Sequence, residues 1–130
     1  MDATTSAYLS ITSDSSLDFA RIGELLCMSA TETWSPTSGE SKPRKWNWGW
    51  RVQSDLPREA DPEQQVEHLV TLIEACAGEL ARYVREAPVK ATIEVVLYQN
   101  DDGNPQLFLE PELVQRVARL GVALWLDIYP

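Results

Sequence analysis

Alternation of apolar and polar residues predicts strands at three places along the chain. It runs through residues 8–13, 46–53 and 122–129. A period of two residues puts the apolar side chains on one face of a strand and the polar ones on the other. We therefore expect three strands, each with one face against a core.

A fourth strand and a hairpin are predicted in the second half of the chain. Residues 90–99 are rich in β-branched side chains and lead into N-D-D-G-N-P at 100–105. Clusters of this kind reverse the direction of the chain. Leu107–Leu109 is then expected to be the return strand of the hairpin.

A period near 3.6 residues predicts three helices. The first covers about 16–28, after a capping-box spacing of Ser15 and Asp18. The second is one long helix over 62–86 with a single apolar stripe. A third, short helix follows Pro111.

These elements predict an α+β fold with the order β-α-β-α-β-β-α-β. We expect a single mixed, mostly antiparallel sheet with three helices packed mainly on one face. The 130 residues suit one domain over 1–130, with an ordered core at about 7–129. Residues 31–45, rich in Ser, Thr, Gly and Pro, are expected to form a long surface loop.

The charges divide the chain into acidic and basic parts. The net charge is −9, yet residues 41–58 carry five bases and one acid. An acidic surface repels phosphate backbones, so we expect no nucleic-acid partner. It favours a basic protein partner, because opposite charges speed the encounter. The basic residues of the middle stretch are Lys42, Arg44, Lys45, Arg51 and Arg58.

Hydropathy and cysteine content predict a cytoplasmic protein without a membrane partner. No apolar run approaches the roughly 20 residues that span a bilayer. Met1–Ser13 has neither the basic start nor the apolar stretch of a signal peptide. Cys27 and Cys76 lack a C-x-x-C spacing, and reduced, partly buried thiols are the favoured interpretation.

Six short motifs stand out along the chain: I-T-S-D-S-S-L-D at 11–18, Thr33-Trp34, Gly49-Trp50, His68-Leu69, L-F-L-E-P-E-L at 107–113 and Leu126-Asp127-Ile128-Tyr129. In this order they resemble the motifs of the domain of unknown function 4279 family, a set of small bacterial proteins. The resemblance covers about residues 8–129, although residues 35–45 contain less Gly and Arg than the family pattern, and Trp46 and Trp48 are additional aromatics. It implies the α+β fold and no particular reaction.

The residues that carry chemistry form no recognisable catalytic set. His68 is the only histidine, and metal sites usually need two or three His or Cys ligands. The spacing in Asp101-Asp102-Gly103-Asn104 is wrong for a calcium loop. No serine occurs in a nucleophile elbow, and there is no Gly-rich phosphate loop. We therefore predict no catalytic residue, no metal and no cofactor.

The leading hypothesis is a non-catalytic protein-binding domain, such as an immunity or antitoxin-like protein that neutralises a basic bacterial toxin. Its carboxylates would imitate the anionic substrate of the toxin, and Trp and Arg are common interface anchors. The alternative interpretation is that the same acids bind no partner and form only a solvated helix face and a solvated turn. The candidate partner-binding residues are Glu63, Glu67 and Glu74 on the long helix, Asp101 and Asp102 at the hairpin tip, and Trp34 and Trp46.

Two other hypotheses remain open. A small-molecule-binding domain or an enzyme would place a pocket on the sheet face at Trp48, Trp50, Trp125, Asp127 and Tyr129. In a self-associating protein, a tryptophan patch would be buried in a symmetric dimer, so the expected state is a monomer or a weak homodimer. Equally, Trp46, Trp48 and Trp50 could line the core face of a strand, and Asp127 could be a structural acid with a nearby partner.

Overall fold

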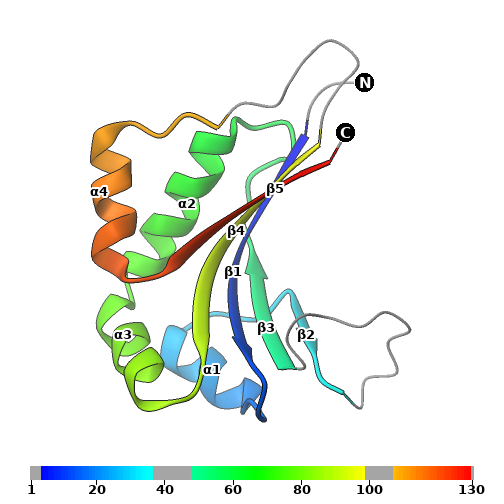
Figure 1. Cartoon of the computed structure of the whole chain (residues 1–130), viewed down its shortest axis with the longest axis vertical. Coiled ribbons are helices and arrows are strands. Elements are labelled where there is room, and N and C mark those ends of the chain that lie inside the picture. The colour runs from blue at the N-terminus through cyan, green and yellow to red at the C-terminus, as the bar shows by residue number, and fades with distance from the viewer. Residues whose placement is uncertain (1–3, 37–47, 99–106, 130) are drawn as a thin grey trace.

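The computed structural model describes residues 4–36, 48–98 and 107–129 and has the order β-α-β-β-α-α-β-α-β (Figure 1). The elements are β1 (Thr4–Ser13), α1 (Phe19–Leu26), β2 (Glu32–Trp34), β3 (Trp48–Gln53), α2 (Pro62–Glu74), α3 (Ala77–Glu86), β4 (Lys90–Tyr98), α4 (Pro111–Leu120) and β5 (Ala123–Tyr129). No helix among these residues is long and apolar enough to cross a membrane.

One mixed sheet organises the described residues. Its strand order is β2-β3-β1-β4-β5, with β1 at the centre. All neighbouring pairs are antiparallel except β4 and β5, which run parallel. Parallel neighbours need a crossover connection, and α4 supplies it. The predicted α+β class and the mixed, mostly antiparallel sheet are confirmed.

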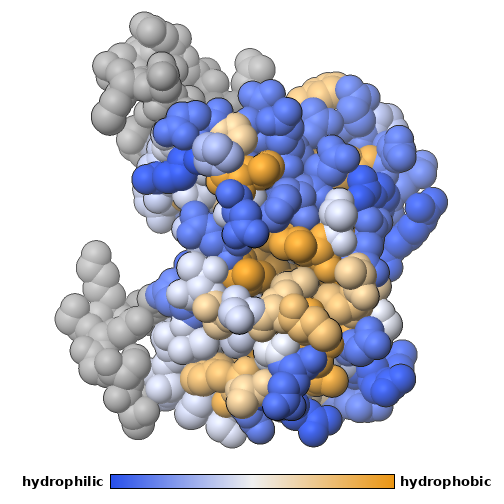
Figure 2. All heavy atoms as spheres, turned by 180° about the vertical axis from the view of Figure 1, so that it is seen from behind, coloured by the Kyte–Doolittle hydropathy of each residue, from blue (hydrophilic) through white to orange (hydrophobic). Residues whose placement is uncertain are grey.

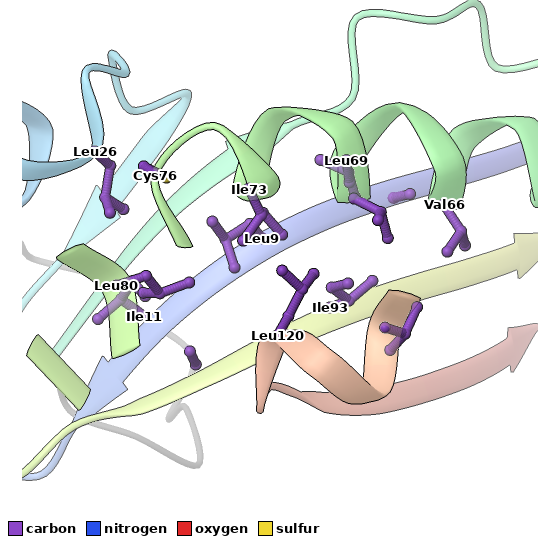
Figure 3. Close-up of a cluster of buried hydrophobic side chains, with 14 of the residues drawn as sticks. Leu9, Ile11, Leu26, Val66, Leu69, Ile73, Cys76, Leu80, Ile93 and Leu120 are labelled. Carbon is purple, nitrogen blue, oxygen red and sulfur yellow. The ribbon is translucent and has the colours of Figure 1, made fainter. Parts of the chain in front are cut away.

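The helices lie on one side of the sheet and bury its apolar face (Figure 1). Leu9 of β1 and Ile93 of β4 point toward α2, whereas Ile11 of β1 lies beside Leu80 of α3 (Figure 3). The facing side chains of α2 include Leu69 and Ile73, and all of these residues are fully buried. Burial of one such side chain stabilises the fold by roughly 1.5–3 kcal/mol. The apolar residues that recur every two positions in the strands and every 3.6 positions in α2 therefore pack together in a single core.

The described residues form four helices, so the prediction of three was wrong. The single helix expected over 62–86 is divided into α2 and α3. Cys76, between them, has φ −128° and ψ 22°, outside the helical region. Because the apolar stripe continues across the break, Ile73 and Leu80 both reach the core. The only local signal in the sequence is Gly78, two residues after Cys76, because glycine disfavours the interior of a helix.

The predicted hairpin was wrong, and so was the predicted loop at residues 32–34. Leu107–Leu109 forms no strand, because both sides of β4 are occupied, one by β1 and the other by β5. Within the expected loop at 31–45, residues 32–34 form β2 and pair with β3. The turn residues 99–106 and the rest of that loop, from residue 37, lie outside the described residues.

Asp18 begins α1 as its N-cap. Its Oδ1 accepts a hydrogen bond of 3.1 Å from the backbone N–H of Arg21, a donor that would otherwise have no partner in the helix. Replacing Asp18 by alanine should lower the free energy of unfolding by about 1 kcal/mol, measured by urea denaturation. Asp14→Ala removes an exposed acid just before this turn and is the matched control. Equal losses in both variants would contradict the capping role.

Candidate functional site: the open face of the sheet

The face of the sheet opposite the helices, here called the open face, carries no described helix. Side chains alternate along each strand, so the register fixes which residues share this face. Ser10 lies between Arg51 of β3 and Thr92 of β4, and Glu94 lies between Tyr8 and Trp125. Polar and aromatic residues from all five strands thus meet on one surface.

Arg51 is the centre of a polar network on the open face. Its Nη2 lies 2.6 Å from Oε2 of Glu94, and its Nη1 lies 3.5 Å from Oε2 of Glu32. Its Nε donates a hydrogen bond of 3.3 Å to Oγ of Ser10, which is fully buried. The Arg51 and Glu94 side chains are 19% and 18% exposed, so the short ion pair is largely shielded from water. Charge-assisted bonds in such surroundings are stronger than those between neutral groups.

Two aromatic rings complete the packing around Arg51. Its guanidinium carbon lies 4.3 Å from the centroid of the Tyr8 ring and 5.4 Å from that of Trp34. Both distances are within the range of cation–π attraction. Trp34 in turn lies directly over Gly49, its partner in the register. Arg51 is therefore fixed by contacts on several sides, which makes this part of the face rigid.

The other end of the open face leaves its aromatic rings in water. Tyr98, Trp125 and Tyr129 are between 37% and 46% exposed. Tyr98 and Tyr129 stack with ring centroids 5.5 Å apart, and the Arg58 guanidinium lies 5.2 Å from the Tyr98 ring. Exposed aromatic side chains on a rigid support resemble the anchors of protein interfaces.

A shallow hollow of about 300 Å³ lies between these two regions. It is bordered by charged and hydroxyl groups on one side and by β5 on the other. Its lining residues are Thr12, Lys90, Thr92, Glu94, Ala123, Leu124, Trp125 and Leu126.

Asp127 has a partner on its own strand. A hydrogen bond from the Tyr129 hydroxyl to the Asp127 carboxylate, followed by the charge of that carboxylate, raises the pKa of Tyr129 above its usual value. A raised folded-state pKa favours the neutral phenol. Stability linked to this group is therefore complete below the ordinary tyrosine pKa and is lost as pH rises through the folded-state pKa.

Asp127→Ala should shift the ionisation of one tyrosine to lower pH, because it removes both the acceptor and the charge. Comparing the tyrosinate absorbance of wild type and variant during alkaline titration measures this. Asp55→Ala removes an exposed acid elsewhere in the chain and should leave the titration unchanged. An unchanged curve for Asp127→Ala would exclude the hydrogen bond.

The five residues of the predicted pocket lie on two different faces of the sheet, so they do not line one pocket. Trp125, Asp127 and Tyr129 belong to the open face. Trp48 and Trp50 face the helices, because they pair with Ser13 and Ile11 on the core side of β1. Trp50 is 1% exposed within the core, and the Trp48 ring contacts that of Phe19 at 5.8 Å between centroids.

The acids predicted for partner binding on the long helix have partners within the chain. Arg116 of α4 binds Glu74 with distances of 2.7 and 3.1 Å and lies 3.7 Å from Glu67. The hydrogen bond to Arg116 lowers the pKa of Glu74. Glu63 accepts a hydrogen bond of 3.4 Å from the backbone N–H of Glu110. All three therefore help to join α2 to α4 and the segment before it.

The remaining predicted residues contribute no exposed contact surface among the described parts. Trp34 is buried, at 6% exposure. Trp46, Asp101 and Asp102 lie outside the described residues.

His68, on α2, has its Nδ1 buried without a hydrogen-bond partner. Cys27 is exposed and Cys76 is buried, both as free thiols, and burial raises the pKa of Cys76.

Helices covering one face of a five-stranded mixed sheet, with an aromatic and charged open face, define a small two-layer α+β protein. The chain belongs to the family described as Domain of unknown function (DUF4279), whose model matches residues 3–130. The resemblance in the sequence motifs is thereby confirmed. No curated protein and no solved structure matches the chain.

Proposed function

We propose that the protein is a non-catalytic protein-binding domain that takes up its partner on the open face of the sheet. The observation that carries this proposal is the contrast along that face. Arg51, Glu94 and Tyr8 are fixed to one another at one end, whereas Trp125 and Tyr129 remain exposed at the other. A rigid support keeps the entropy lost on binding small, and the exposed aromatic rings supply area to bury.

In this proposal the charged groups of the open face have a structural role. Glu94 pairs with Arg51, and Asp127 accepts the hydroxyl of Tyr129. A general acid or base needs a reactive proton within reach of a substrate. These two acids are instead occupied by neighbours in the chain, which favours recognition over catalysis.

Affinity capture with two matched variants tests the proposal. Trp125→Ala removes an exposed anchor from the open face, whereas Phe108→Ala removes an exposed aromatic ring from the segment before α4. A protein captured by wild type should be lost with Trp125→Ala, by roughly tenfold or more in affinity for a central anchor. It should be retained by Phe108→Ala. Equal capture by both variants would contradict the proposal.

The narrower form of the proposal is an immunity or antitoxin-like protein that neutralises a basic bacterial toxin. Its support is the net charge of −9, which attracts a basic partner. The acids on α2 give it less support, since Glu67 and Glu74 are joined to Arg116. A basic toxin encoded beside this gene should lose activity when the purified protein is added. Full toxin activity at saturating protein would refute this form only.

A second candidate function is small-molecule binding in the hollow beside Trp125. Its volume of about 300 Å³ is at the lower limit for ligand pockets, and Lys90, Glu94 and Thr12 offer polar contacts beside an aromatic ring. A thermal-shift screen with wild type and Lys90→Ala tests it. A compound that stabilises wild type more than the variant would favour this candidate over a protein partner.

A further inference from the structure

Exposed apolar side chains are concentrated in β5. Five of the eight large hydrophobic residues that are exposed in the described parts belong to this strand. Figure 2 shows the reverse of the view in Figure 1, with apolar surface gathered toward the end that holds α1 and α3. None of the eight belongs to α1 or α3.

Three of the β5 residues form an apolar row on the helix side of the sheet. Leu124, Leu126 and Ile128 pair with buried residues of β4 that belong to the core, and yet they are 44–48% exposed themselves. The neighbours of this row on β4 are Ile93, Val95 and Leu97. The core therefore continues past β4, and its last row has no cover among the described residues.

Val114 of α4 extends this apolar surface. Arg116 faces α2, where it binds Glu74. Val114 is two residues away, roughly 200° around the helix at 3.6 residues per turn, so it faces away from α2. It is 49% exposed. Around the axis of α4, Val117 lies between the directions of Arg116 and Val114, and it faces the core. Val114 thus lies on the flank of α4 that is turned from α2.

Among the described strands, β5 is also an edge of the sheet that lacks the usual protection. Edge strands usually avoid pairing by being short or by carrying Lys, Pro or other charged residues. The opposite edge, β2, has three residues, one of which is Glu32. β5 has seven residues, no Lys or Pro, and Asp127 as its single charge. The two edges therefore differ in their capacity to accept another strand.

We propose that β5 pairs antiparallel with β5 of a second copy of this chain, about a two-fold axis at Leu126. A two-fold axis normal to the sheet keeps the helices of both copies on one side, so each residue pairs with one of the same face. Leu126 is the middle residue of Ala123–Tyr129, and this register pairs the whole strand. The proposal is tested separately from the proposed function, because its measurements use Leu124 and Leu126 on the helix side of β5, although Trp125 and Asp127 of the open face also lie along the paired strands.

In this register, each residue of the apolar row lies opposite an apolar residue of the second copy. Leu124 lies opposite Ile128 of the second copy, and Leu126 lies opposite its own equivalent. Asp127 lies opposite Trp125 of the second copy. An axis at Asp127 would instead put two carboxylates opposite each other, which is destabilising. The strands of both copies then form one continuous sheet, with the two open faces side by side.

Cysteine pairs test the register directly. Directly opposed residues in antiparallel strands have Cβ atoms about 4.5–5.5 Å apart, close enough for a disulfide after a small adjustment. In a Cys27→Ser background, Leu126→Cys should therefore oxidise to a covalent dimer. Leu124→Cys, equally exposed, is the control: four residues separate it from its own equivalent along the paired strand, roughly 13 Å. It should remain monomeric on a non-reducing gel.

Light scattering across a concentration series supplies the second measurement. Wild type should approach twice the chain mass of 14.6 kDa. Leu126→Lys should keep that single-chain mass, with an unchanged circular dichroism spectrum, because two ammonium groups would meet at the axis. Ala81→Lys, at an exposed position of α3, should remain dimeric. Any of three results would overturn the proposal: wild type monomeric throughout, Leu126→Lys still dimeric, or equal cross-linking of Leu124→Cys and Leu126→Cys.

Discussion

Replacing Arg51 by methionine should lower the free energy of unfolding by roughly 2–4 kcal/mol, measured by urea denaturation. The substitution leaves the Glu94 carboxylate, 18% exposed, without the cation that lies 2.6 Å away. It also leaves the buried Ser10 hydroxyl without its donor and the Tyr8 ring without its stacked guanidinium. An unpaired charge in a shielded position costs more than the ion pair contributes.

Two further variants isolate the cause. Arg116→Met removes an arginine that pairs with Glu74 on the solvent-exposed side of α2, where water replaces the lost partner, so its effect should be much smaller. Arg51→Met combined with Glu94→Leu removes both charges and should recover much of the lost stability. If Arg51→Met were no more harmful than Arg116→Met, Arg51 would not be the organising group of the open face.

Gly49→Ala should lower the free energy of unfolding by about 2–3 kcal/mol. A Cβ atom at residue 49 would overlap the Cζ2, Cε2 and Cη2 atoms of the Trp34 indole. Trp34 is buried across this glycine and lies beside Arg51, so the ring has to leave its position. Urea denaturation gives the loss, and a red shift of the tryptophan emission should accompany it as Trp34 enters water.

Gly78→Ala is the matched control for this prediction. Gly78 lies in α3, and an added Cβ meets nothing within 4 Å. Alanine favours the helix over glycine, so this variant should gain up to about 1 kcal/mol. A loss at Gly78 similar to that at Gly49, or an unshifted emission for Gly49→Ala, would contradict the packing of Trp34 on Gly49.

The core could be predicted from periodicity because burial is itself periodic. Leu9 and Ile11 alternate with polar residues, and Leu69 and Ile73 recur at helical spacing, as the sequence predicted. Strand pairing could not be predicted in this way. The turn residues at 100–105 indicated a hairpin, but the residues of a turn do not determine which strands pair with the two sides of β4. Those edges are occupied by β1 and β5, which are distant in sequence.

The site was predicted in part for a related reason. Alternation shows which residues share a face, but not which face the helices cover. Trp125 and Tyr129 were placed correctly together, whereas Trp50 was grouped with them and faces the core instead. Arg51 and Glu94 were missed as a pair, since 43 residues separate them. The sequence nevertheless contained one indication of this pair. Glu94 is the only charged residue within 91–98, and an acid in an apolar strand needs a partner.

Site-specific photocross-linking tests the central claim, that the open face binds a protein partner, most directly. A photoreactive phenylalanine analogue would replace Tyr129 on the open face or, as the control, Gln115 at an exposed position of α4. Both proteins would be irradiated in cells of the source organism, and the adducts compared by mass. We expect a discrete adduct with a different protein from residue 129 and none from residue 115. Adducts from residue 115 alone, or from neither position, would contradict the claim.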